Sequence, residues 1–164
     1  MLGRRLREKL REEHGWTYGT TGGFKGYRAG GMVTIGGAIE VDHTGEALEE
    51  ILATIDRLGV DVVTEDELAD AKRRAMGAFA RNFETLSGIT SALVGMATFD
   101  VPASEWVGIA TRIDAVTKAE LLALSKLWMK SSAMSIVVVG DAKKLKPQLE
   151  ALWLGTIEVR GQKP

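Results

Sequence analysis

A helix-to-strand junction at residues 10–19 constrains the fold of this chain more than any other feature. Leu2, Leu6 and Leu10 recur every fourth residue, which predicts a short amphipathic helix. Gly15 follows as a helix stop, and the Gly- and Thr-rich stretch after it favours a strand. A fold that accommodates this junction must pack a helix beside the strand that directly follows it.

Two side chains with binding chemistry flank the predicted helix stop. Arg11 lies on the helical side and Tyr18 on the strand side. Arginine offers a rigid fork of donors, and tyrosine offers a ring with a polar tip, so together they suit a carbonyl or carboxylate. A structural role is the alternative, because an arginine at a helix end complements the helix dipole and a strand tyrosine often serves packing.

The remaining patterns predict an α+β domain, with an antiparallel-dominated sheet and helices packed on one face. Gly30-Gly31 separates two predicted strands and indicates a hairpin. An unbroken β-branched run later in the chain is typical of a buried central strand. The predicted strands are 16–27, 32–41, Ile136–Val139 and Thr156–Val159.

Helices are predicted from apolar stripes and from their start signals. Leu48, Ile51, Leu52 and Ile55 give the spacing of a helix that ends near Gly59. Two capping-box patterns open further helices, Thr64 with Glu67 and Thr117 with Glu120. Additional helical segments are predicted at 89–99, 105–113 and 144–154.

Composition narrows the classes of protein that fit. With 164 residues, 45% hydrophobic and 26% charged, the chain is expected to form a single domain over residues 1–164. A net charge of −1 does not suit nucleic-acid binding. The longest apolar stretch, 89–99, is too short to span a membrane, and the absence of cysteine is compatible with any compartment.

Three segments, in order along the chain, resemble one family. They are Leu10–Gly19, Val63–Lys72 and Ser135–Asp141. By these motifs the chain is identified as a member of the insulinase/pitrilysin family of zinc peptidases, of bacterial type. It resembles the C-terminal-type domain, which lacks the metal. The resemblance implies a metallohydrolase-like fold that lacks its first strand and helix, with partly uncovered leucines at positions 2–10. We therefore expect an unpaired sheet edge and self-association.

The resemblance also implies a function. Members of the family pair two similar halves around a chamber that takes unfolded peptides; one half carries an H-x-x-E-H zinc helix. The other half supplies an arginine and a tyrosine that hold the substrate, and Arg11 and Tyr18 match them in type and spacing. The chain would thus be the inactive, substrate-binding part of a zinc metalloendopeptidase. The alternative is a scaffold subunit of the same family that has lost proteolysis.

No metal site is expected in this chain itself. Leu10-Arg-Glu-Glu-His14 keeps the Glu-His end of H-x-x-E-H but has leucine where the first histidine belongs. The other histidine, His43, lies in a different predicted element, and Glu84 is a distant carboxylate. Zinc needs two imidazoles one helical turn apart with a further ligand, so zinc and catalytic residues are expected only in the partner half.

Overall fold

The computed structural model describes residues 1–161, which form an α+β arrangement of eight α-helices and a two-stranded antiparallel sheet. The elements are α1 (Leu2–Arg7), the π-helix η1 (Glu8–Glu13), β1 (Thr17–Tyr27), β2 (Gly30–Ile39), the 3₁₀ helix η2 (Val41–His43), α2 (Thr44–Leu58), α3 (Glu65–Arg81), α4 (Leu86–Phe99), α5 (Ser104–Val107), α6 (Ile109–Ala115), α7 (Lys118–Trp128), the 3₁₀ helix η3 (Ser131–Ala133) and α8 (Ala142–Ala151).

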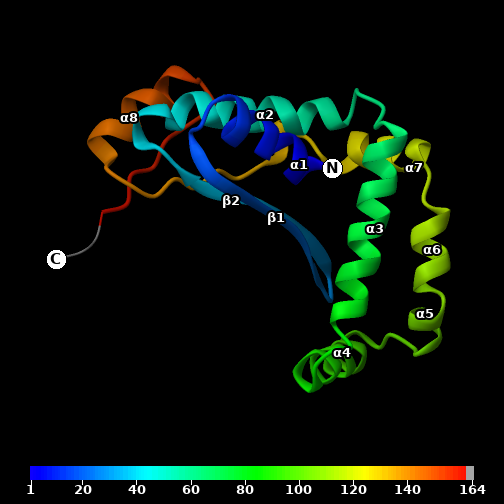
Figure 1. Cartoon of the computed structure of the whole chain (residues 1–164). Helices are drawn as coiled ribbons and strands as arrows, with labels where there is room; N and C mark the ends of the chain where they lie inside the picture. Colours follow the sequence, from blue (N-terminus) through cyan, green and yellow to red (C-terminus); the bar gives the residue numbers. More distant parts are fainter. Residues whose placement is uncertain (162–164) are drawn as a thin grey trace.

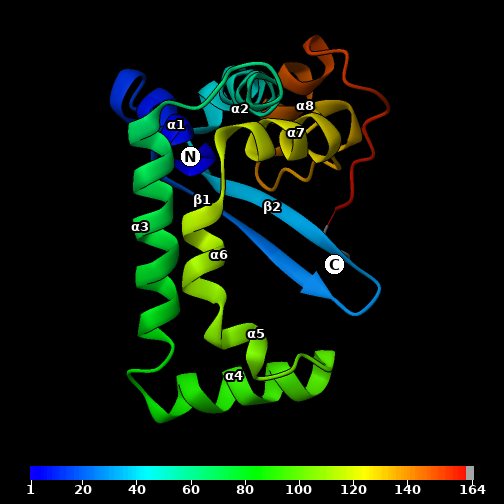
Figure 2. The ribbon, with the colours of Figure 1, turned by 90° about the vertical axis from the view of Figure 1, so that its right-hand side faces the viewer.

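The helices form an upper layer and a long arm. In Figure 1, α1, α2 and α8 lie together above the start of the hairpin. Helices α3 and α6 run side by side away from that layer, and α4 lies across their far end (Figures 1 and 2). The hairpin extends in the same direction, and Arg28 beside its turn pairs with Asp100 at the end of α4, with a nitrogen–oxygen distance of 2.9 Å.

The core lies where α1 packs on α2 and on the sheet. Leu6 and Leu10 are 1% and 0% exposed and pack with Ala47 of α2. The expectation that the leucines of the first helix are partly uncovered is therefore wrong for these two residues. The sheet and α2 supply the neighbours that the leucine stripe requires.

Both predicted capping boxes are confirmed. The Thr64 hydroxyl accepts from the Glu67 backbone N–H, and the Glu67 carboxylate accepts from the Thr64 N–H, each at 3.1 Å. Thr117 and Glu120 make the same reciprocal pair at the start of α7. Because these bonds satisfy amides that a helix start leaves unpaired, the two boxes fix where α3 and α7 begin.

Two predicted strands do not form. Residues 136–139 and 156–159 have no strand partner within residues 1–161, and Val137 and Val139 are 86% and 93% exposed. A β-branched run becomes a strand only when another strand edge pairs with it, and no described edge does so. The predicted helix 105–113 is also divided, because α5 ends before Gly108 and α6 begins after it.

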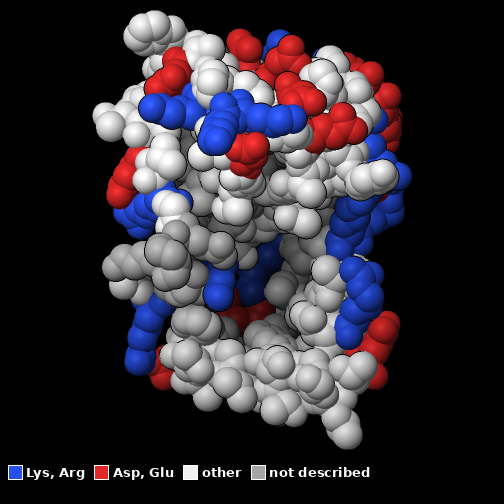
Figure 3. All heavy atoms as spheres, turned by 90° about the vertical axis from the view of Figure 1, so that its left-hand side faces the viewer, with Lys and Arg blue, Asp and Glu red and all other residues white. Residues whose placement is uncertain are grey.

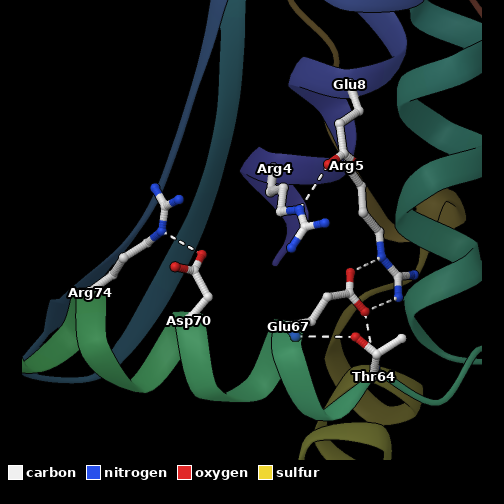
Figure 4. A network of polar contacts seen from close by, with 7 residues as sticks. All are labelled: Arg4, Arg5, Glu8, Thr64, Glu67, Asp70 and Arg74. Atoms are coloured by element: carbon white, nitrogen blue, oxygen red, sulfur yellow. Dashed lines mark hydrogen bonds and ion pairs between the residues drawn. The ribbon is translucent and has the colours of Figure 1, made fainter.

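A network of charged side chains joins α1 to α3 (Figure 4). The Arg5 guanidinium donates two hydrogen bonds to the Glu67 carboxylate, at 2.9 and 3.0 Å. Arg4 pairs with Glu8 along the first helical segment, and the side chain of Asp70 accepts from Arg74 along α3. The Arg5–Glu67 pair holds the first turn of α3 against α1, and the other two pairs lie within their own helical segments.

The accessible surface of the chain is larger than is typical of a folded monomer of the same mass. Its accessible surface is 11727 Å², whereas a folded monomer of this size exposes about 8,000 Å². Helix α4 contains no charged residue. Figure 3 shows one face of the molecule, whose lower part is nearly free of charge and lies below a hollow.

Within residues 1–161, no helix combines the length and apolar character needed to cross a membrane.

Candidate functional site

Arg11 lies on an irregular helical segment. The α-helix of α1 continues as the π-helix η1, and this helix ends at His14. The Arg11 side chain is exposed and makes no hydrogen bond or ion pair with any residue of 1–161. Short π-helical segments are frequent at functional sites, so the backbone around Arg11 supports a role beyond helix formation.

The turn after η1 delivers the chain directly into β1. Gly15 has a φ of +71°, a left-handed conformation that glycine adopts without strain. Its N–H donates to the Arg11 carbonyl at 3.1 Å, and the Trp16 N–H donates to the Leu10 carbonyl at 2.9 Å. The predicted stop at Gly15 is confirmed, and this turn fixes the separation of Arg11 and Tyr18.

Tyr18 lies on a bulge at the start of the sheet. Thr17 pairs with Ile39 and Thr20 pairs with Gly37, so two residues of β1 face one residue of β2. The Tyr18 side chain is 94% exposed, which rules out the packing role considered from the sequence. Because bulges redirect side chains beside binding sites, this irregularity presents the phenol to solvent.

The Thr17 hydroxyl stabilises the bulge. It lies 2.6 Å from the Ala38 carbonyl and accepts from the Gly19 N–H at 3.1 Å, while the Thr17 residue is 6% exposed. Gly37 sits opposite the bulge, where an added Cβ would approach the Gly19 carbonyl to 2.9 Å. A buried hydroxyl on one strand and a glycine on the other thus hold the backbone that carries Tyr18.

Three aromatic rings support the same junction. Trp16 stacks on His14 with ring centroids 3.9 Å apart, and on His43 with centroids 5.1 Å apart. His43 lies at the start of α2, where its Nδ1 is 2.9 Å from the Glu46 carboxylate. The stack therefore links the turn between η1 and β1 to α2.

Comparison with known proteins identifies the family of this junction. Residues 1–75 match the family model described as the peptidase M16 inactive domain. Over these residues the chain is similar to the peptidase M16 inactive domain. Arg11, Tyr18 and the segment Val63–Lys72 all lie within the matched part, whereas Ser135–Asp141 lies outside it. The predicted resemblance to the inactive-type domain of the insulinase family is confirmed over residues 1–75.

A solved structure has the same fold. The chain resembles the crystal structure of a peptidase M16 inactive domain from Pseudomonas fluorescens, with 23% sequence identity and a TM-score of 0.68. The similarity covers 77% of this chain and 30% of that one, so the chain spans about a third of the length of the solved structure. No curated protein matches the chain closely enough to count as a relative.

Residues 10–14 lack the zinc ligands of an H-x-x-E-H motif. Leu10 occupies the position of the first histidine, and it is fully buried in the core. The His14 ring stacks on Trp16. Among residues 1–161, no group of three or more histidine, cysteine, aspartate or glutamate residues could hold a metal ion, and Glu84 joins no such group.

The structure brings some predicted residues together and leaves others apart. His14 and His43, predicted in different elements, meet on Trp16. Arg11 and Tyr18 flank the same turn, but no hydrogen bond joins their side chains. The supporting roles of Trp16 and Thr17 were not predicted from the sequence. The sequence signal for these roles is Trp16, which comes two residues after His14 and directly before Thr17 at the start of the strand.

Proposed function

We propose that this chain is the substrate-binding, non-catalytic part of a zinc metalloendopeptidase. It closes a peptide chamber opposite a partner domain or subunit that carries an H-x-x-E-H zinc site. Zinc in the partner would supply the activated water, and this chain would supply positioned hydrogen-bond donors. The match of residues 1–75 to the peptidase M16 inactive domain supports the pairing with an active half.

One observation carries the proposal. Arg11 and Tyr18 are both exposed, and neither side chain has a polar partner within residues 1–161. Each is nevertheless presented by a well-supported backbone irregularity, the π-helix for Arg11 and the bulge for Tyr18. Donors that are held in place but unpaired are suited to a ligand from outside the chain.

The chemistry of the two donors suits a peptide backbone. The Arg11 fork can donate to a substrate carbonyl, and the Tyr18 phenol can donate a second hydrogen bond nearby. Such contacts recognise groups that every peptide carries, so they favour an unfolded or extended substrate of broad sequence. If charge develops on the carbonyl oxygen during hydrolysis, the same donors stabilise the oxyanion.

Peptide affinity in the assembled enzyme tests the proposal. The partner's motif glutamate is replaced by glutamine so that substrate binds without being cleaved, and binding is followed by fluorescence anisotropy. Arg11→Ala and Tyr18→Phe should each weaken binding. Arg81→Ala and Tyr27→Phe, which alter exposed residues elsewhere, serve as matched controls. Equal affinity for all four variants would favour the scaffold function instead.

A further inference from the structure

We propose that His43 is a positioning residue for the peptide contacts of Arg11 and Tyr18. Its ring stacks on Trp16, and through Trp16 it restrains the turn that carries both donors. The inference rests on the function proposed for Arg11 and Tyr18. It adds to them a residue that lies outside the junction at positions 10–19.

The backbone alone determines where Arg11 and Tyr18 lie. Neither side chain has a polar partner within the described chain. The two residues flank the turn at Gly15 and Trp16, whose N–H groups donate to the carbonyls of Arg11 and Leu10 at 3.1 and 2.9 Å. Because glycine adopts many backbone conformations with little strain, this turn needs support from outside. Any freedom in the turn passes directly to both donors.

Trp16 is the residue through which other elements contact this turn. Its carbonyl accepts from the Glu40 N–H at 2.9 Å, and its indole stacks on the rings of His14 and His43. The His14 ring belongs to the turn itself, because His14 ends η1. His43 comes from a different element, at the point where η2 ends and α2 begins. Of the two stacked rings, His43 is therefore the one that connects the indole to another part of the fold.

The contact between Trp16 and His43 has the geometry of an offset stacked pair. The ring centroids are 5.1 Å apart and the ring planes differ by 14°. Favourable aromatic pairs have centroids about 4.5–7 Å apart, and offset stacking is one of their preferred arrangements. Such a pair restrains the indole even though the His43 side chain is 41% exposed.

His43 is in turn held by α2. Its Nδ1 lies 2.9 Å from the carboxylate of Glu46, which belongs to the first turn of that helix. Helix α2 also carries Ala47 and Ile55, which are 0% and 2% exposed, so the core fixes its position. A continuous set of contacts thus runs from a core helix through His43 and Trp16 to the turn.

The His43 side chain does not cap α2. His43 is the N-cap residue of this helix, but its side chain makes no cap hydrogen bond. The side-chain oxygen of Gln148 in α8 accepts from the Gly45 N–H at 2.9 Å instead. Removing the imidazole therefore leaves this cap in place, which allows positioning to be separated from folding.

Hydrogen exchange on the full chain tests whether His43 restrains the turn. The amides of Gly15 and Trp16 report on the turn, and the Glu67 amide at the start of α3 is the internal reference. His43→Ala removes the stack, His43→Phe restores an aromatic ring, and Glu49→Ala changes an exposed residue of α2 as the matched control. We expect His43→Ala to speed exchange of both turn amides by about two- to tenfold, the factor that an aromatic pair contributes. His43→Phe should restore slow exchange, while Glu67 exchange and the melting temperature stay unchanged.

Peptide binding by the assembled enzyme tests whether this restraint serves the two donors. The partner's motif glutamate is again replaced by glutamine, and fluorescein-labelled casein serves as the unfolded probe. His43→Ala should weaken binding by about two- to tenfold, His43→Phe should restore it, and Glu49→Ala should leave it unchanged. Arg11→Ala is measured beside them to separate positioning from the proposed function.

Unchanged exchange of the turn amides in His43→Ala would overturn the proposal. So would failure of His43→Phe to restore slow exchange, because stacking would then not be the cause. Faster exchange at Glu67 with a fall in melting temperature would also overturn it, since His43 would then serve general stability. Weaker binding by Arg11→Ala with parental binding by His43→Ala would overturn the positioning role and leave the proposed function intact. Parental binding by Arg11→Ala would overturn both.

Discussion

Arg5 and Glu67 form a bidentate ion pair that joins α1 to the first turn of α3. The two hydrogen bonds measure 2.9 and 3.0 Å, and the side chains are only 20% and 10% exposed. Hydrogen bonding from Arg5 lowers the pKa of Glu67 from 4.5 to about 2. The same carboxylate completes the capping box with Thr64, so one residue both begins α3 and attaches it to α1.

The pair makes folding stability depend on pH in the acid range. Because the folded pKa of Glu67 lies below its ordinary value of 4.5, its contribution is present above that value and is lost as pH falls toward about 2. Glu67→Gln should lower the free energy of unfolding by roughly 1–3 kcal/mol at pH 7 and flatten its acid dependence. Urea titrations at several pH values measure both effects, with the exposed Glu84→Gln as control. An unchanged pH slope in the Glu67 variant would contradict the assignment.

The chain alone should neither bind zinc stoichiometrically nor cleave peptides. Metal analysis of protein purified without chelators checks the first point, and one tightly held zinc per chain would show it to be wrong. Restoring the missing histidine should not create a site, because Leu10 is fully buried. We expect Leu10→His to cost about 2–5 kcal/mol of stability without zinc uptake.

Thr17 should control the bulge that presents Tyr18. Thr17→Val keeps the shape of the side chain but leaves the Gly19 N–H and the Ala38 carbonyl without their hydroxyl partner. We expect a loss of about 1–3 kcal/mol in stability and weaker peptide binding by the assembled enzyme. The exposed Thr21→Val is the matched control. If both variants unfold alike and bind peptide alike, the bulge has no special role.

The isolated chain should self-associate. Unpaired strand edges and the uncharged helix α4 leave apolar surface exposed among the described residues, and such surface tends to pair. Sedimentation of the chain over a concentration series measures the effect. A chain that stays monomeric over the whole concentration series would be evidence against self-association.

Local signals predicted the elements that local chemistry determines. Thr64 and Thr117 begin helices as predicted because a capping box is satisfied within one turn. Gly15 ends the first helical segment as predicted because its left-handed backbone suits glycine. Arg11 and Tyr18 lie on either side of that turn, whereas their role in substrate binding rests on the family resemblance and stays a prediction.

Features that depend on distant partners could not be predicted in the same way. The run Ile136–Val139 has the composition of a buried strand, but pairing requires a neighbouring edge that sequence pattern does not reveal. The stacking of His14 and His43 on Trp16 depends on how α2 packs beside the turn. The bulge at Tyr18 depends on the register with β2, which no local pattern in β1 specifies.

Peptide turnover by the assembled enzyme tests the central claim most directly. Removing a positioned oxyanion donor typically costs roughly 2.7–4 kcal/mol of transition-state stabilisation, or about 10²–10³ in rate. Arg11→Ala and Tyr18→Phe should each lower kcat/KM to that extent while zinc content and melting temperature stay unchanged. A kcat/KM within about twofold of the parent for either variant would contradict a substrate-binding role and favour the scaffold function.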